Sequence, residues 1–161
     1  MPADKVLPYI GGTRYNIICA MCIDGVCAVA SYVGSNNIDT VMHFLINHMF
    51  NQGGPMGKFP APNSVLVLDN ASYHHANNDL VTRFCEAHGA LVVFLPAYSP
   101  DLNPIEQLFS AVKHRIRRDF QQLSNTQTPV ADLKRIFHDV GTPQNARGWI
   151  DCSYGDVIPV D

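Results

Sequence analysis

Hydrophobic and polar positions along the chain predict strands first and helices later. Residues 14–21 and 26–33 are rich in β-branched and aromatic side chains, and Asp24-Gly25 stands between them. An Asp-Gly pair between two β-favouring runs predicts a hairpin. Behind an asparagine pair, apolar residues then recur at helical spacing over about 37–50, which predicts a helix with a polar cap.

Two apolar runs without polar alternation follow, at 65–68 and 90–95, with a helical pattern over 76–87 between them. Continuous apolar runs bounded by turn formers predict strands that are buried on both faces. A strand-helix-strand unit of this size predicts parallel neighbours joined by a right-handed crossover. The glycine- and proline-rich residues 51–63 predict a loop.

The last third of the chain reads as helical, with a long helix over about 104–120 and shorter ones over about 130–140 and 143–150. Residues 1–13 lack a pattern and form a lead-in. The predicted fold class is α/β, a mixed sheet with helices on its faces, in one domain over 1–161. The long helix has an apolar core face at Ile105, Leu108, Phe109, Val112 and Ile116.

Composition supports one globular domain. Of the 161 residues, 47% are hydrophobic and 16% are charged, which is not the composition of a disordered chain. No apolar run approaches the roughly 20 residues of a membrane helix, and no signal peptide is visible. The five cysteines are irregularly spaced, so we expect a reduced, intracellular protein. Cys19 and Cys22 are three apart in a predicted strand, which favours packed thiols over a zinc site.

The net charge of -3 does not by itself indicate a nucleic-acid partner. The distribution is more informative, because four basic residues fall within one window of the long helix. They are Lys113, Arg115, Arg117 and Arg118. The alternative is a solvated helix face that complements the helix dipole.

Two carboxylates stand at the ends of predicted elements. Asp69 directly follows the 65–68 strand, at the end where open α/β sheets bind ligands, and Glu106 lies in the first turn of the long helix. Each has a structural alternative. Asp69 can cap a turn, and Glu106 can complete a capping box with Asn103 as N-cap and Pro104 as the first helical residue.

Paired carboxylates at such positions are typical ligands of Mg2+ or Mn2+. Two such ions, about 3.5–4 Å apart, catalyse phosphoryl transfer in many enzymes. Residues 106, 110, 113 and 117 lie along one side of the predicted helix. Lys113 and Arg117 therefore follow Glu106 on a face that could bind a DNA backbone. His74, five residues after Asp69, is either structural or a support for a metal ligand.

The amino-acid sequences of two segments resemble those of a known family. Leu68-Asp69-Asn70-Ala71-Ser72-Tyr73-His74, then Phe94-Leu95-Pro96-Ala97-Tyr98-Ser99-Pro100-Asp101-Leu102-Asn103-Pro104-Ile105-Glu106, then Lys113, closely resemble the mariner-type branch of the DDE transposases and its bacterial insertion-sequence relatives. The shared pattern is Asp-Asn-x-x-x-His, a Ser-Pro-Asp-Leu-Asn-Pro-Ile-Glu block and a lysine on the ensuing helix. Weaker similarity extends over nearly the whole chain.

The resemblance implies a ribonuclease H-like fold and a two-metal endonuclease and strand-transfer centre, with Mg2+ or Mn2+ as cofactor. Its partner would be DNA, as transposon ends and target. Formation of a homodimer is an open alternative. Asp69 would be the second catalytic acid and Glu106 the third, both as metal ligands. Asn70 and His74 would orient these ligands, and Lys113, Arg117 and Arg118 would bind DNA.

The resemblance also implies that Asp101 is structural in its loop. Such a protein would act in the nucleus of a eukaryote, or in the cytoplasm or nucleoid of a bacterium.

The chain departs from this pattern in its amino-terminal part. The family needs a first acid on an opening strand upstream of the hairpin, and neither Asp4 in the lead-in nor Asp24 in the hairpin turn suits that place. A helix-turn-helix DNA-recognition region is also not visible. We therefore expect an amino-terminally shortened catalytic domain with impaired cleavage. The alternative is a non-catalytic nucleic-acid-binding remnant. A generic phosphohydrolase is weaker, because no nucleophile or glycine-rich phosphate loop supports it.

Overall fold

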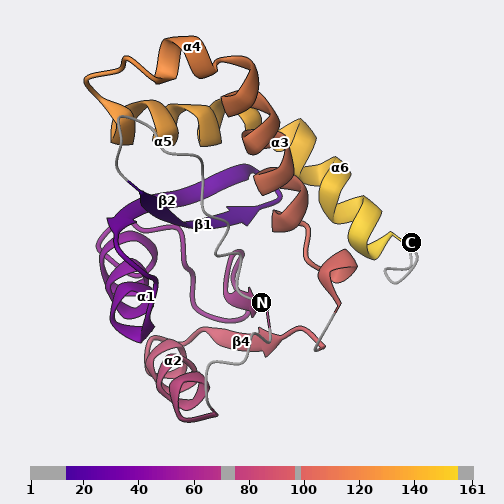
Figure 1. Cartoon of the computed structure of the whole chain (residues 1–161). Helices are drawn as coiled ribbons and strands as arrows, with labels where there is room; N and C mark the ends of the chain where they lie inside the picture. Colours follow the sequence, from indigo (N-terminus) through magenta and orange to yellow (C-terminus); the bar gives the residue numbers. More distant parts are fainter. Residues whose placement is uncertain (1–13, 70–74, 97–98, 156–161) are drawn as a thin grey trace.

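The computed structural model describes residues 14–69, 75–96 and 99–155, and its elements follow the predicted α/β order (Figure 1). In chain order they are β1 (Tyr15–Cys22), β2 (Gly25–Val33), α1 (Ile38–Phe44), the π-helical turn η1 (Leu45–Met49), β3 (Val65–Leu68), α2 (His75–Ala87), β4 (Leu91–Phe94), the 3-10 turn η2 (Pro100–Leu102), α3 (Ile105–Arg118), α4 (Phe120–Leu123), α5 (Pro129–Val140) and α6 (Pro143–Tyr154). No helix among these residues is long and apolar enough to span a bilayer.

The predicted hairpin is confirmed. β1 and β2 pair antiparallel from Tyr15 opposite Val33 to Cys22 opposite Gly25, with a register shift after Ala20. Gly25 has φ +108°, which side chains rarely adopt. A Cβ added to Gly25 would also lie 2.5 Å from the carbonyl oxygen of Gly141.

The tip of the hairpin rests on the corner between α5 and α6. The backbone N–H of Val26 donates to the carbonyl oxygen of Gly141, with the N and O atoms 3.0 Å apart. The glycine that shapes the turn therefore also permits this close approach.

The helix expected over 37–50 is present as α1 followed by η1, and its polar cap is a capping box. The side chain of Asn37 accepts from the backbone N–H of Thr40 at 3.0 Å, and the Thr40 hydroxyl oxygen accepts from the backbone N–H of Asn37 at 2.9 Å. Two backbone donors at the helix start are thereby satisfied. Residues 51–63 contain no helix or strand, as predicted.

The predicted β-α-β unit is confirmed, with β3 and β4 parallel and paired from Val65 opposite Leu91 to Leu68 opposite Phe94. The expectation of one mixed sheet is not met among the described residues. There the strands form two separate two-stranded sheets, β1 with β2 and β3 with β4. A ribonuclease H-like arrangement of one continuous sheet therefore stays a prediction.

The expectation that β3 is buried on both faces is wrong. One face of the β3–β4 sheet is open, and its residues Val65, Val67, Leu91 and Val93 are between 42% and 47% exposed. The other face packs into the core through Leu66, Leu68 and Val92. The apolar run made both faces suitable for burial, but the described part of the chain covers only one of them.

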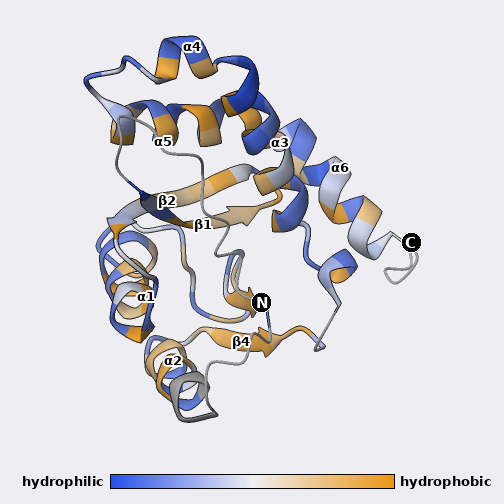
Figure 2. Ribbon diagram, in the orientation of Figure 1, coloured by the Kyte–Doolittle hydropathy of each residue, from blue (hydrophilic) through white to orange (hydrophobic). Residues whose placement is uncertain are grey.

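The hairpin separates two hydrophobic cores, because successive strand residues point to opposite faces. Val29 belongs to the core shared with α3 and α5, whereas Ala28 and Ala30 belong to the core shared with α1, η1 and α2. In the first core, Phe109 and Phe137 pack edge to face with their ring centroids 5.4 Å apart. Figure 2 shows that α5 turns its hydrophobic side toward the hairpin and that β4 is hydrophobic along its length.

The carboxyl-terminal helices follow the prediction with shifted ends. The predicted core face of α3 is confirmed at four positions, which are Leu108, Phe109, Val112 and Ile116. The helix ends at Arg118, earlier than expected, and Asp119 separates it from α4. The last helix, α6, runs four residues past its expected end at 150, to Tyr154.

Candidate active site

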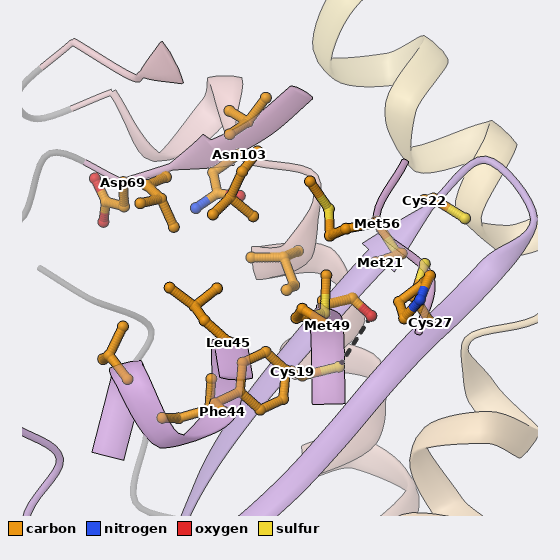
Figure 3. A pocket seen from close by; sticks show the side chains of 18 of the residues that line it. Cys19, Met21, Cys22, Cys27, Phe44, Leu45, Met49, Met56, Asp69 and Asn103 are labelled. Carbon is orange, nitrogen blue, oxygen red and sulfur yellow. Dashed lines mark hydrogen bonds between the residues drawn. The ribbon is translucent and has the colours of Figure 1, made fainter. Parts of the chain in front are cut away.

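Asp69 lies directly after β3 and borders a cavity of about 390 Å3. The cavity lies between β1 and β3, and Phe44, Leu45 and Met49 of α1 and η1 cover one side of it. Figure 3 shows the Asp69 side chain at one end of this mostly apolar space, with the sulfur atoms of several cysteines and methionines toward the other end. A carboxylate at the carboxyl end of a strand is placed where α/β proteins bind ligands.

The segment that carries Glu106 borders the same cavity. Asn103, Pro104 and Ile105 line it, and Figure 3 shows Asn103 on the same side of the space as Asp69. Glu106 follows directly in the first turn of α3 and is half-buried. The structure thus places Asp69 and the start of α3 at one cavity, although 37 positions separate the two acids in the sequence.

The predicted capping box at Glu106 is wrong. α3 begins at Ile105 with Pro104 and not Asn103 at the N-cap, and the Pro104 side chain makes no capping hydrogen bond. The backbone N–H groups of Glu106 and Gln107 instead donate to the carbonyl oxygens of Asn103 and Pro104, at 3.0 Å and 3.2 Å. The chain enters the helix from a tight turn, whose own carbonyls accept these bonds.

The loop before α3 is held by its own backbone hydrogen bonds and by a residue far away in the sequence. Within it, the N–H of Asn103 donates to the carbonyl oxygen of Pro100 at 3.0 Å, and Asp101 is exposed in the first turn of η2. From the end of α6, the hydroxyl of Tyr154 donates to the carbonyl oxygen of Leu102 at 2.6 Å. Burial raises the pKa of Tyr154, so the hydroxyl stays protonated and remains a donor. Sequence reasoning missed Tyr154, whose sole signal was the weaker family similarity that extends over nearly the whole chain.

The two carboxylates suit a hard divalent cation, because Mg2+ takes oxygen ligands and is held by one or two carboxylates together with water and substrate phosphate. Among the residues that the structure describes, no three His, Cys, Asp or Glu side chains gather as a metal-binding group. The role of Asp69 and Glu106 as metal ligands therefore stays a prediction. Asn70 and His74 lie outside the described residues, so their expected supporting role stays a prediction, and Asp4 lies outside them as well.

The sequence argues against Asp24 as a first acid, because it lies in the hairpin turn. In the structure it is exposed there, 3.4 Å from the guanidinium of Arg147 on α6. This placement, at the tip of the hairpin beside α6, agrees with that reasoning.

The basic residues of α3 point in two different directions around the helix axis. At about 100° per residue, Lys113 and Arg117 point within about 20° of Glu106, whereas Arg118 is turned away by about 120°. The guanidinium groups of Arg115 and Arg118 both bond the carboxylate of Asp119, with Arg118 Nε at 3.0 Å. These bonds hold the pKa of Asp119 below its usual range.

The charge of Arg118 is therefore partly balanced within the protein. A DNA-binding role at Lys113, Arg117 and Arg118 stays a prediction.

Three free thiols also border the cavity, away from Asp69 (Figure 3). Burial raises the pKa of Cys27 to about 12, and it raises the pKa of Cys19 still further. The neutral thiol is therefore the stable form at both positions, which suits packing better than metal ligation.

Comparison with protein families matches residues 2–127 to the domain described as DDE superfamily endonuclease. The matched range contains both candidate acids and the basic part of α3. No match was found among curated proteins or among solved structures.

Proposed function

This chain belongs to the DDE superfamily endonucleases, and we propose that it acts on the phosphodiester backbone of DNA as a transposase-like nuclease domain. The family implies a DNA substrate and, in general, a divalent metal. The observation that carries the proposal is that Asp69 and the start of α3 border one cavity. Asp69 lines this cavity itself, and Glu106 directly follows three residues that line it, Asn103, Pro104 and Ile105.

In this proposal Asp69 and Glu106 hold Mg2+ or Mn2+. The bound cation would polarise the scissile phosphate and lower the pKa of an attacking water, which is the chemistry that such ions supply. The protein would contribute by positioning the two carboxylates. Asp69 is fixed by the end of β3, and Glu106 is fixed by the loop that Tyr154 holds from α6.

The finer assignments rest on the sequence resemblance. They are a mariner-type or insertion-sequence origin, a ribonuclease H-like sheet, and two metal ions at the centre. The pattern requires three acids, and only Asp69 and Glu106 match it by position. We therefore propose that residues 1–161 by themselves cleave DNA weakly. The second candidate is a nucleic-acid-binding remnant without catalysis, which the basic side of α3 favours.

Metal binding tests the proposed site directly. Mn2+ titration, followed by water-proton relaxation, should show binding that Asp69→Asn and Glu106→Gln each weaken by at least about tenfold, because each loses a charged ligand. Asp79→Asn and Glu86→Gln are matched controls, since both acids are exposed on α2. Equal Mn2+ binding by all four variants would show that Asp69 and Glu106 do not hold the cation.

Cleavage is tested by nicking of supercoiled plasmid with Mg2+ or Mn2+. The wild-type chain should nick slowly or not at all. Rapid nicking that Asp69→Asn abolishes would contradict the proposed impairment, and it would show that the chain forms a complete centre.

DNA binding separates the two candidate functions. Fluorescence anisotropy at low salt should show salt-sensitive binding that weakens when Lys113 and Arg117 are both changed to Gln, because each neutralised phosphate contact contributes through counterion release. Arg83→Gln, at an exposed position of α2, is the control. Binding that survives Asp69→Asn without any nicking would favour the remnant. No binding at low salt would contradict both candidates.

A further inference from the structure

Two histidine rings lie beside each other where α1 passes into η1. The ring centroids of His43 and His48 are 6.3 Å apart, and their planes are tilted by 57°. His43 is exposed and His48 is half-buried, so the pair is open to solvent. Neither ring lines the cavity beside Asp69, so the pair lies outside the candidate active site.

An uncommon backbone feature brings the two rings together. In a regular α-helix, side chains five positions apart point about 140° away from each other. From Leu45 to Met49 the chain is π-helical instead, and the N–H of Phe50 donates to the carbonyl oxygen of Leu45 at 2.9 Å, five residues back. The wider turn brings His48 round toward the side of His43. Single π-helical turns are rare and are frequently found at functional sites.

A tyrosine from another element orients the first ring. The hydroxyl oxygen of Tyr32, on β2, lies 3.1 Å from Nδ1 of His43, and the two rings meet edge to face with their centroids 5.8 Å apart. When this hydroxyl accepts the N–H at Nδ1, the lone pair at Nε2 is free. Metal-binding histidines are usually held through their other ring nitrogen in this way. Burial raises the pKa of Tyr32, so the side chain stays a neutral phenol that positions His43.

The second ring is held in its neutral form. Burial lowers the pKa of His48, and the charges of Lys134 on α5 and of His43 lower it further. Neutral imidazole is the form that binds a metal ion. The ring of His48 also packs against Phe44, with the centroids 5.6 Å apart, which restricts its orientation.

The spacing of the rings suits one shared ion. Zn–N bonds are about 2.0–2.1 Å long, so two imidazole centroids on one ion lie about 5–6 Å apart. A small rotation of the exposed His43 ring reaches this spacing from 6.3 Å. In the part of the chain that the structure describes, no third His, Cys, Asp or Glu completes a metal-binding group, so water would fill the other positions.

We propose that His43 and His48 bind a divalent transition-metal ion such as Zn2+ at the junction of α1 and η1, with Tyr32 as a positioning residue. Imidazole nitrogens favour zinc, copper and nickel, whereas carboxylates favour Mg2+. The ion would join the two helical segments and, through Tyr32, fix them to β2. The proposal is independent of the nuclease function, because neither Asp69 nor Glu106 takes part.

Zn2+ affinity tests the two ligands. Titration against a colorimetric chelator, with Mg2+ in excess to occupy carboxylate sites, should show binding that His43→Gln and His48→Gln each weaken by at least about tenfold. His88→Gln is the matched control and should bind as the wild type does. The His88 ring is also held through Nδ1, 2.7 Å from the carbonyl oxygen of Phe84, but it packs against phenylalanine rings and not against a second histidine.

The coordination itself is read from Cu2+ bound to the wild-type chain. Its electron paramagnetic resonance spectrum should show hyperfine splitting from two nitrogen ligands, and this result decides the ligand set even if a histidine variant fails to fold. Tyr32→Phe should keep both nitrogens but weaken Zn2+ binding about tenfold, because His43 loses the partner that orients it. Lys134→Gln should tighten binding, since it removes a nearby positive charge.

Several results would overturn the proposal. Zn2+ binding that both histidine variants retain would place the ion elsewhere, and loss of binding in Asp69→Asn would place it at the candidate active site. A copper spectrum with one nitrogen ligand or none would exclude the pair as ligands. One ion for every two chains, with a zinc-dependent dimer, would assign the ion to a contact between copies. No Zn2+ binding up to millimolar concentration would show that the two rings only pack together.

Discussion

The hydroxyl of Tyr154 donates to the backbone carbonyl oxygen of Leu102 at 2.6 Å, and these residues are 52 positions apart. The bond attaches the end of α6 to η2, the turn that leads into α3. Glu106 follows this turn by four residues, so the bond helps to set where that carboxylate lies. The last helix of the chain therefore contributes to the geometry of the candidate site without supplying a ligand to it.

Tyr154→Phe should lower the free energy of unfolding by about 1 kcal/mol, because the carbonyl of Leu102 loses its donor while the ring stays in place. Amides from Leu102 to Glu106 should also exchange faster. Tyr32→Phe is the matched control, since the hydroxyl of Tyr32 bonds Nδ1 of His43 at an exposed site, 3.1 Å away. Urea unfolding and amide exchange measure both effects. Unchanged exchange in the loop would show that Tyr154 does not position it.

Gly25→Ala should destabilise the protein more than Gly34→Ala does. Both glycines have positive φ, +108° and +101°, so alanine pays a similar backbone penalty of about 1–3 kcal/mol at each. A Cβ at Gly34 meets nothing within 4 Å, whereas at Gly25 it would overlap the carbonyl oxygen of Gly141. The difference between the two variants in thermal unfolding therefore measures the overlap alone. Equal destabilisation would mean that the hairpin tip does not sit against Gly141.

Phe109→Ala should cost about 3–5 kcal/mol, the usual range for a large aromatic ring removed from a core. The ring is 1% exposed and packs edge to face on Phe137. Phe120→Ala is the control, because that ring on α4 is 47% exposed, and it should cost less than about 1 kcal/mol. Denaturant unfolding compares the two. Similar costs would contradict the position of the core between α3 and α5.

Acid should remove a stabilising contribution from two carboxylates. Hydrogen bonds from Arg115 and Arg118 lower the pKa of Asp119, and those from Thr126 and Arg135 lower that of Asp132. A carboxyl group whose pKa is lower in the folded state stabilises the fold above its unfolded pKa, which is about 3.9. That contribution is lost as the pH falls from about 4 through the lowered folded pKa.

Asp119→Asn and Asp132→Asn should therefore be less stable than the wild type at pH 7, with the difference shrinking at strongly acid pH. Urea unfolding across this range gives the measurement, with Asp79→Asn on α2 as the control. A difference that is independent of pH would show that the two carboxylates act through shape and not through charge.

Local elements of the fold were predictable because their signals are short-range. Asp24-Gly25 marked the hairpin, and Asn37 marked the start of α1. The apolar runs around 65–68 and 91–94 marked two parallel strands. What the pattern could not supply was the neighbour of each strand. An apolar run indicates that a strand suits burial on both faces, but the cover for Val65 and Val67 depends on contacts from elsewhere.

The candidate site, like the fold, could be predicted from the sequence only in part. Asp69 and Glu106 could be chosen from their places at the ends of elements and from family resemblance. The cap expected at Asn103 was wrong because backbone carbonyls of the preceding turn already accept the first N–H bonds of α3. Tyr154 could not be found by spacing, since nothing near it in the sequence indicates that its hydroxyl reaches Leu102.

The contact between the hairpin tip and Gly141 has a consequence for how the chain folds during synthesis. The hairpin is made early, but the N–H of Val26 has its acceptor only after α5 has been completed. This contact closes a very long loop, and contacts of that kind form late and slow folding. Residues after position 127, where the family match ends, are therefore needed to complete the packing of β1 and β2. A nascent chain released before Gly141 would carry a formed hairpin with its docking surface missing, and such partly folded species are prone to aggregate.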